Sequence, residues 1–328
     1  MKPSGAAYDG SALPSFVAHA DWGTQPAKRQ VAVAHLSGSA NGQYIIDSIK
    51  PADPSAIASG DLRRGLGVPD GVSRAILGFD LPLGLPRAYA DRVGVTSFLE
   101  FLDGLGEPPW EDVIHPATHA SEIALHRPFY PYRPGGTSRQ HLTDALGLSS
   151  QQLRRLCEGS DAETIFWTLG GKQVGKAAIS GWVLLHQALS SGSNIGVWPF
   201  DGNIAECIRA HEITVVETYP RELYRWAAPE WPLGSQRWSK TRQEDRQLWA
   251  TSIATWVSEL GTAWTDDVRD MAYDGFGSDS NGEDRFDALI GLLGMIAVVT
   301  GALDSGVPSD DPAVVSVEGW ILGRTTSM

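Results

Sequence analysis

The first fifty residues carry the pattern that most constrains the fold. Three apolar stretches of strand length follow one another closely, at 15–22, 29–38 and 41–51. An Asn-Gly pair at the start of the third stretch is a turn signal typical of hairpins. Because short connections join antiparallel neighbours, these residues predict a three-stranded antiparallel meander.

A fourth strand is predicted at 75–79, after a short polar segment at 53–66 that we expect to be helical. Asp80 lies at the carboxyl end of this strand, as Asp21 does at the end of the first. Pro82 then ends the strand, because proline has no N–H to donate to a neighbouring strand. Two of the predicted strands therefore lead directly into an aspartate.

The pattern changes from residue 87 onward. Residues 87–210 combine helical segments, Pro-rich loops and aromatics, which indicates a large, mainly helical insertion. The stretch at 213–224 returns to a β-branched strand with Glu217 at its end, and Pro220 suits the first turn of a following helix. A further helix is predicted at 242–259.

Length bears on how these segments divide into domains. A chain of 328 residues is longer than the roughly 150 residues of an average domain. We expect one α/β domain with an insertion. Its core comprises 1–86 and 211–328, and 87–210 is the insertion.

The helix predicted at 283–300 places two acids and two glycines on one face. Asp284, Asp287, Gly291 and Gly294 follow one another at i, i+3, i+7 and i+10. Each glycine costs a helix about 1 kcal/mol relative to alanine. Two glycines on one stripe therefore indicate that this helix approaches a sheet closely, which would bring both aspartates near the strand ends.

We expect these acids to form a metal site. Carboxylates that converge without basic partners repel one another and are costly to bury, and a divalent ion removes that cost. Their hard oxygens suit Mg²⁺ or Mn²⁺, and two such ions can activate water and stabilise the leaving oxygen of a phosphodiester. Each acid alone is also a common turn former or helix cap. The candidate catalytic residues are Asp21, Asp80, Glu217, Asp284 and Asp287.

Five segments carry a resemblance to a known family. They are ADWGT at 20–24, GFDLPLGLP at 78–86, ETYPRELY at 217–224, EDRFDALIGLL at 283–293 and EGWILGR at 318–324. These segments are similar to the domain of unknown function 429 family, which comprises predicted RNase H-like nucleases. The order of the acids is also similar to that of RuvC-type resolvases.

The resemblance implies an RNase H-like mixed sheet with flanking helices, and a role for each acid. Asp21 would bridge the metals, Asp80 would take the fourth-strand position, and Asp284 with Asp287 would complete the metal site. Glu217 departs from the simplest RNase H pattern, so it is either an extra ligand or a substrate-binding group. The expected activity is metal-dependent hydrolysis of a nucleic acid or nucleotide.

Basic residues are the candidates for substrate contact. Gly170 to Lys176 fits the G-x-x-x-x-G-K spacing of a P-loop, but Ala177 stands where a P-loop has Ser or Thr to hold magnesium. We expect instead a helix N-terminus at which Lys172 and Lys176 hold a phosphate or counter the acidic cluster. Solvated surface lysines are the alternative. Arg221 is the third candidate.

Two other functions stay open. The D-x-G-T at 21–24 also resembles the first phosphate motif of the actin, Hsp70 and sugar-kinase superfamily, which would make the chain an ATPase or phosphotransferase. Twelve tryptophans and the aromatic, Arg-bearing loop at 127–139 would suit a binding module without catalysis. We expect most of those tryptophans to lie in the core.

Charge and apolar length bear on partners and location. The net charge of −13 argues against non-specific coating of nucleic acid and favours a small, structured or partner-delivered substrate. The longest apolar stretch, 289–299, is far short of the roughly 20 residues of a membrane span. Two isolated cysteines, Cys157 and Cys207, form no disulfide framework, and the N-terminus has no secretory pattern. We expect a cytoplasmic protein without a membrane partner.

Overall fold

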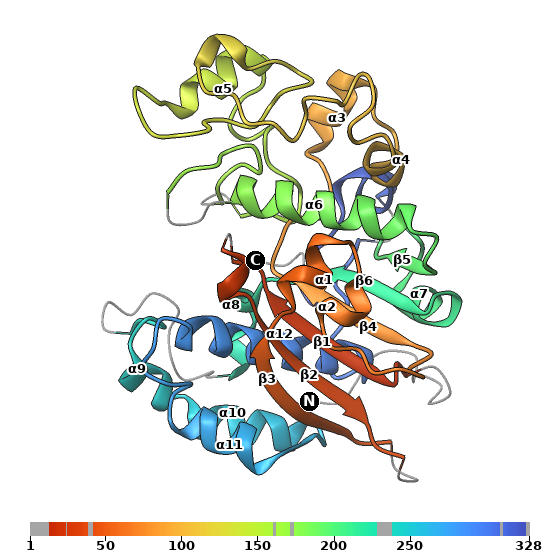
Figure 1. The fold of residues 1–328 in the computed structure, drawn as a ribbon, viewed down its shortest axis with the longest axis vertical. Coiled ribbons are helices and arrows are strands. Elements are labelled where there is room, and N and C mark those ends of the chain that lie inside the picture. The colour runs from red at the N-terminus through yellow and green to blue at the C-terminus, as the bar shows by residue number, and fades with distance from the viewer. Residues whose placement is uncertain are drawn as a thin grey trace.

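The computed structural model describes residues 13–23, 25–38, 42–159, 162–170, 174–227, 238–308 and 311–325. It shows an α/β fold with one mixed sheet of seven strands in the order β5-β6-β4-β1-β2-β3-β7 (Figure 1). The strands are β1 Phe16–Asp21, β2 Gln30–Leu36, β3 Tyr44–Pro51, β4 Ala75–Phe79, β5 Ile195–Val197, β6 Ile213–Glu217 and β7 Ala263–Trp264.

The predicted meander is confirmed. Strand β2 pairs antiparallel with both β1 and β3, whereas β4 pairs parallel with β1 and β6 pairs parallel with β4. Residues of β1 alternate between two apolar cores, with Ala18 and Ala20 on one face and Val17 on the other. Such alternation is what a strand covered on both faces requires.

Helices cover each face of the sheet. The predicted helical segment at 53–66 folds as two short helices, and the predicted helix at 242–259 is divided into α9 and α10. The helices before the seventh strand are α1 Pro54–Ala58, α2 Leu62–Gly65, α3 Arg87–Val93, α4 Phe98–Asp103, α5 Arg139–Leu146, α6 Val174–Ser190, α7 Ile204–Ala210, α8 Pro220–Ala227, α9 Gln243–Gln247 and α10 Ala250–Glu259. The helices after it are α11 Asp266–Tyr273 and α12 Gly282–Val299, and short 3-10 or π turns occur at Pro26–Lys28, Ala120–Glu122 and Val314–Glu318.

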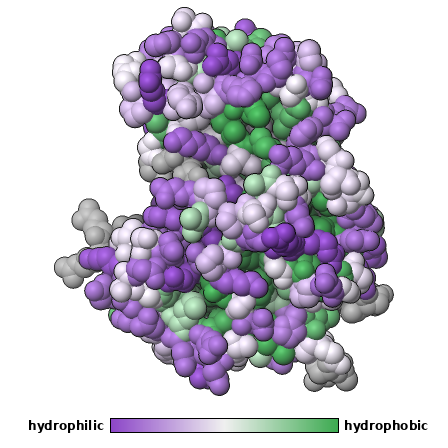
Figure 2. Space-filling view, viewed as in Figure 1, coloured by the Kyte–Doolittle hydropathy of each residue, from purple (hydrophilic) through white to green (hydrophobic). Residues whose placement is uncertain are grey.

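The segment expected as an insertion lies mostly apart from the sheet. In Figure 1, α3, α4 and α5 occupy the upper part of the molecule, and α6 runs between them and the sheet. The boundary expected at 210 differs from the structure, because β5 pairs parallel with β6 and α7 packs against both strands. Figure 2 shows hydrophilic side chains over much of the face in view, with apolar groups in its upper centre and again between hydrophilic groups in its lower half.

Gly291 and Gly294 were both predicted to let α12 approach the sheet closely, and the structure confirms this for Gly291. A Cβ at Gly291 would lie 2.3 Å from ring atoms of His19 in β1, so only glycine allows the helix to approach the sheet this closely. A Cβ at Gly294 would instead meet Leu223 of α8 at 2.3 Å. The first glycine thus faces the sheet and the second faces a neighbouring helix. Figure 1 shows α12 running behind β1 and β2.

Among the described residues, no helix combines the length and the apolar character that crossing a bilayer requires.

Candidate functional site

Four of the predicted acids converge at one edge of the sheet. Asp21 ends β1 and Asp80 follows β4, and these strands are parallel neighbours whose carboxyl ends meet at the same edge. Asp284 and Asp287 lie in the first two turns of α12, which packs across β1 (Figure 1). The carboxyl groups of Asp21 and Asp284 lie close enough to act on each other, and a hydrogen bond between them would require a proton on one of them.

Burial and mutual repulsion hold protons on this cluster. Burial raises the pKa of Asp21 well above its usual range, and the charges of Asp287, Asp80 and Asp284 raise it further. Burial likewise raises the pKa of Asp80 to about 7 and that of Asp284 to about 6. The cluster therefore binds protons near neutral pH when no other cation is present, as expected for carboxylates that lack enough basic partners.

Two side chains hold Asp287 in place. The Tyr224 hydroxyl donates a hydrogen bond to Oδ1 of Asp287 at 2.5 Å, and the Lys240 ammonium pairs with Oδ2. Although burial lowers it, the pKa of Lys240 is raised overall by Asp287 and by the nearby Asp21 and Asp80. Lys240 thus supplies a single positive charge to four acids, which is too little for all four to ionise without a further cation.

Lys240 is a functional candidate that sequence reasoning missed. The loop that carries it is fixed, because Arg246 donates from Nη1 to the Lys240 carbonyl at 2.5 Å and Asp245 accepts from the Ser239 N–H at 2.7 Å. Arg246 is itself buried and donates further hydrogen bonds to the carbonyl of Gly275. A lone lysine in a loop before α9 belongs to no motif, so its sequence context gives no signal for its position.

The structure corrects the expectation for Glu217. Both of its carboxylate oxygens are taken by Arg155, with Nη1 to Oε2 and Nη2 to Oε1 each at 2.7 Å, and the Leu83 N–H also donates to Oε2 at 2.7 Å. Arg155 pairs with Glu158 as well, and its side chain is only 1% exposed. Glu217 therefore belongs to a buried ion-pair network, in which both of its carboxylate oxygens already have partners.

The three basic residues predicted to contact substrate are Lys172, Lys176 and Arg221, and they differ in where they lie. Lys172 lies outside the described residues. Lys176 is half-buried in the first turn of α6, as the expected helix N-terminus requires, and forms no ion pair with a described residue. Arg221 is exposed in the first turn of α8, close to Tyr219. Neither Lys176 nor Arg221 forms a hydrogen bond or an ion pair with the four aspartates in the described structure.

The donor set suits a hard divalent cation. Four carboxylates converge, and Gln30, which lies directly opposite Asp21 across β1 and β2, has a buried Oε1 without a hydrogen-bond partner in the described structure. Carboxylate and amide oxygens are the ligands that Mg²⁺ prefers. In the side-chain positions described, however, no group of three or more His, Cys, Asp or Glu is arranged to hold an ion. Binding a metal would therefore require these side chains to move.

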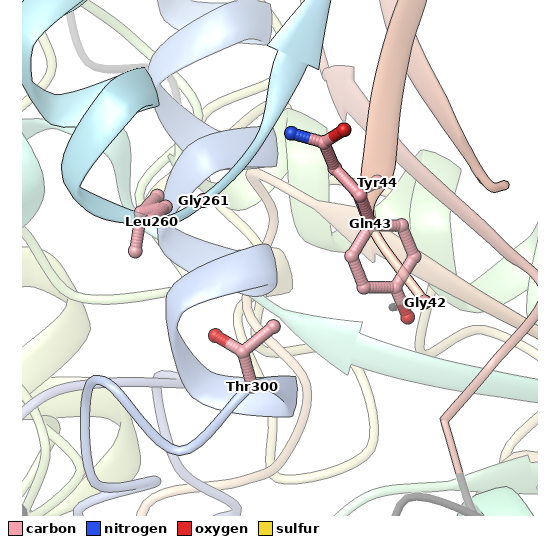
Figure 3. A pocket seen from close by; sticks show the side chains of 6 residues that line it. All are labelled: Gly42, Gln43, Tyr44, Leu260, Gly261 and Thr300. Carbon is pink, nitrogen blue, oxygen red and sulfur yellow. The ribbon is translucent and has the colours of Figure 1, made fainter. Parts of the chain in front are cut away.

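Two surface hollows lie away from the four aspartates. One, of about 360 Å³, lies between β3 and the end of α10, and Figure 3 shows Tyr44 and Thr300 on opposite sides of it. The other, of about 690 Å³, is lined partly by Arg155 and Glu158 of the buried ion-pair network. Neither is lined by a carboxylate of the cluster, so neither adds a residue to this site.

The ionised carboxylate of Asp80 costs folding free energy because it is buried among other acids. Replacing Asp80 by Asn is therefore expected to stabilise the metal-free protein by about 1–2 kcal/mol at pH 8. The folded-state pKa of about 7 lies above the usual aspartate value of 3.8, so the cost of ionisation is full above pH 7. It shrinks as the pH falls and is absent below about pH 4. Urea unfolding in chelator at pH 8 and pH 5 measures this change, with the exposed Asp267→Asn as the control. Destabilisation by Asp80→Asn at pH 8 would show that this acid supports the fold.

Comparisons with protein-family models, with curated proteins and with solved structures give no match.

Proposed function

We propose that the chain is a metal-dependent nuclease with an RNase H-like core. The observation that carries this proposal is the convergence of Asp21, Asp80, Asp284 and Asp287, which come from two strand ends and one helix. An antiparallel meander, a parallel fourth strand and a closing helix are also the elements expected of that fold. Chemistry at the site and the order of the elements thus support the same function.

The four aspartates would hold Mg²⁺ or Mn²⁺. When bound, the ion would activate a water molecule and stabilise the charge that develops on the departing oxygen of a phosphodiester. Tyr224 fixes the orientation of Asp287 through its hydrogen bond. Lys240 places a positive charge beside the same carboxylate, where it would help to attract and orient a substrate phosphate.

Hydrolysis of ATP is the main alternative, and one set of assays separates the two. The purified chain is incubated with labelled single-stranded, duplex, hybrid and branched nucleic acids, and separately with ATP, in Mg²⁺, Mn²⁺ or chelator. We expect cleavage of at least one nucleic acid with either metal, none in chelator, and recovery when metal is restored. Release of phosphate from ATP without cleavage of any nucleic acid would instead indicate a phosphotransferase or ATPase.

A further inference from the structure

Arg29 is a nearly buried cation at the edge of the sheet that carries Asp21. It directly precedes β2, and the residue is 4% exposed. Its guanidinium carbon lies 3.6 Å from the ring centroid of Trp22, and its Nε donates to the Gly23 carbonyl at 3.1 Å. These contacts fix the plane of the guanidinium and leave the two Nη groups at its outer end.

Those two Nη groups find no partner among the described residues. Arg29 forms no ion pair there, and only its Nε donates a hydrogen bond. The other two buried arginines are fully engaged: Arg155 binds two carboxylates, and Arg246 donates from all three nitrogens to carbonyls. Arg29 is therefore exceptional among the buried arginines of this fold.

Burying a charge without an opposite charge costs free energy. This cost is visible in Arg29, because burial lowers its pKa to about 10. Stacking on Trp22 offsets part of the cost but supplies no acceptor for the Nη hydrogens, and neither Nη is among the fully buried polar atoms that lack a partner. Residues that oppose folding in this way are typical of functional sites, and an anionic ligand would supply the missing charge and acceptors.

Chain connectivity places Arg29 at the same end of the sheet as the carboxylate cluster. Trp22 directly follows Asp21, and Arg29 directly precedes Gln30, the residue opposite Asp21. Because successive residues of a strand point to opposite faces, Trp22 packs on the face away from Asp21. There its indole N–H donates to Ser180 of α6 at 2.8 Å. An anion held by Arg29 would therefore lie at the same end of the sheet as the carboxylates but on its opposite face, and would leave them free for another group.

We propose that Arg29 binds a second backbone phosphate of the strand that the carboxylates process, across the end of the sheet from them, so that the substrate is a polynucleotide strand. This inference rests on the proposed function. The guanidinium presents paired donors that match phosphate oxygens, and its stacked, pre-positioned plane favours that geometry over a point charge. A strand supplies phosphates on both sides of the edge of the sheet, which a mononucleotide does not.

Binding is tested separately from cleavage. A labelled single-stranded 15-mer (about the length of one binding groove) is titrated with wild type and with the Arg29→Gln, Arg29→Lys and Arg209→Gln variants. Ca²⁺ replaces Mg²⁺, and gels check that the probe stays intact. We expect about tenfold weaker binding for Arg29→Gln and a salt slope reduced by about 0.7. Arg29→Lys should fall between Arg29→Gln and wild type. Arg209→Gln, an equal change of charge on an exposed helix residue, should match wild type.

A second measurement needs no variant to fold. In wild type, the NMR signal of the Arg29 Nε–H should shift when the 15-mer is added, and that of Arg209 should stay in place. The inference would be overturned if Arg29→Gln kept the wild-type affinity and salt slope. It would also be overturned if the Arg29 signal did not shift, or if wild type did not bind the 15-mer. Equal affinity for thymidine monophosphate would overturn the polynucleotide substrate. If Arg29-dependent binding occurs without any cleavage, only the nuclease proposal fails. Cleavage with binding that is independent of Arg29 would reject this inference alone.

Discussion

Metal-dependent cleavage is expected to fall about a thousandfold when Asp21 is replaced by Asn, while the protein stays folded. Asp21 interacts with all three other aspartates of the cluster, so it is the member that a shared ion would contact most directly. Losing several kcal/mol of transition-state stabilisation corresponds to a loss of this size. Because burial already opposes the charge of Asp21, its removal is expected to leave the melting temperature unchanged or higher.

Single-turnover cleavage rates and thermal melting, measured on the same preparations, check this expectation. Asp267→Asn is the matched control, since it makes the same chemical change at an exposed position in the first turn of α11. The control should cleave within about twofold of wild type, as is usual for surface changes away from a site. An Asp21→Asn variant that cleaves at the wild-type rate would contradict the proposed site. A variant that loses both activity and melting temperature would indicate a structural role.

Replacing Arg155 by Met is expected to have the largest effect on stability, a loss of about 3–5 kcal/mol. The change keeps most of the side-chain volume but leaves Glu217 and Glu158 without their cation. The Arg155 side chain is 1% exposed and that of Glu217 is 5% exposed, so water does little to compensate either charge. Such a loss is a large fraction of the stability of a typical domain.

Urea unfolding of Arg155→Met gives this free energy. Arg269→Met is the comparison, because Arg269 pairs with Asp266 and Asp270 on the surface, where ion pairs contribute little. Adding Glu217→Gln to Arg155→Met is expected to restore part of the loss, since one unpaired charge is removed. If Arg155→Met and Arg269→Met were equally stable, the ion pairs of Arg155 with Glu158 and Glu217 would not contribute to the stability of the fold.

Regular elements were predictable because their patterns are local. The meander, β4 with Asp80 at its end, and α12 follow from apolar runs, turn residues and helical spacing. Gly291 also carried usable information, since two glycines in a long apolar helix indicate close approach before any partner is known. The convergence of the four aspartates followed from these elements, because ends of parallel strands meet at one edge.

What escaped prediction depends on distant contacts. Glu217 ends its strand as Asp80 does, and only the three-dimensional structure shows that Arg155, 62 residues away, occupies it. Lys240 lies in a loop whose position is set by Arg246, a contact with no periodic trace in the sequence. Strand β5 has only three residues, which is too short for an alternating pattern to identify.

The four aspartates come from two distant parts of the sequence, and this affects when they can assemble during protein synthesis. Asp21 and Asp80 are translated early, whereas Asp284 and Asp287 come much later in the sequence and reach the sheet only when α12 packs against β1. A nascent chain that does not yet include α12 would therefore carry half of the carboxylates and no closing helix. All four carboxylates can come together only after α12 has been translated.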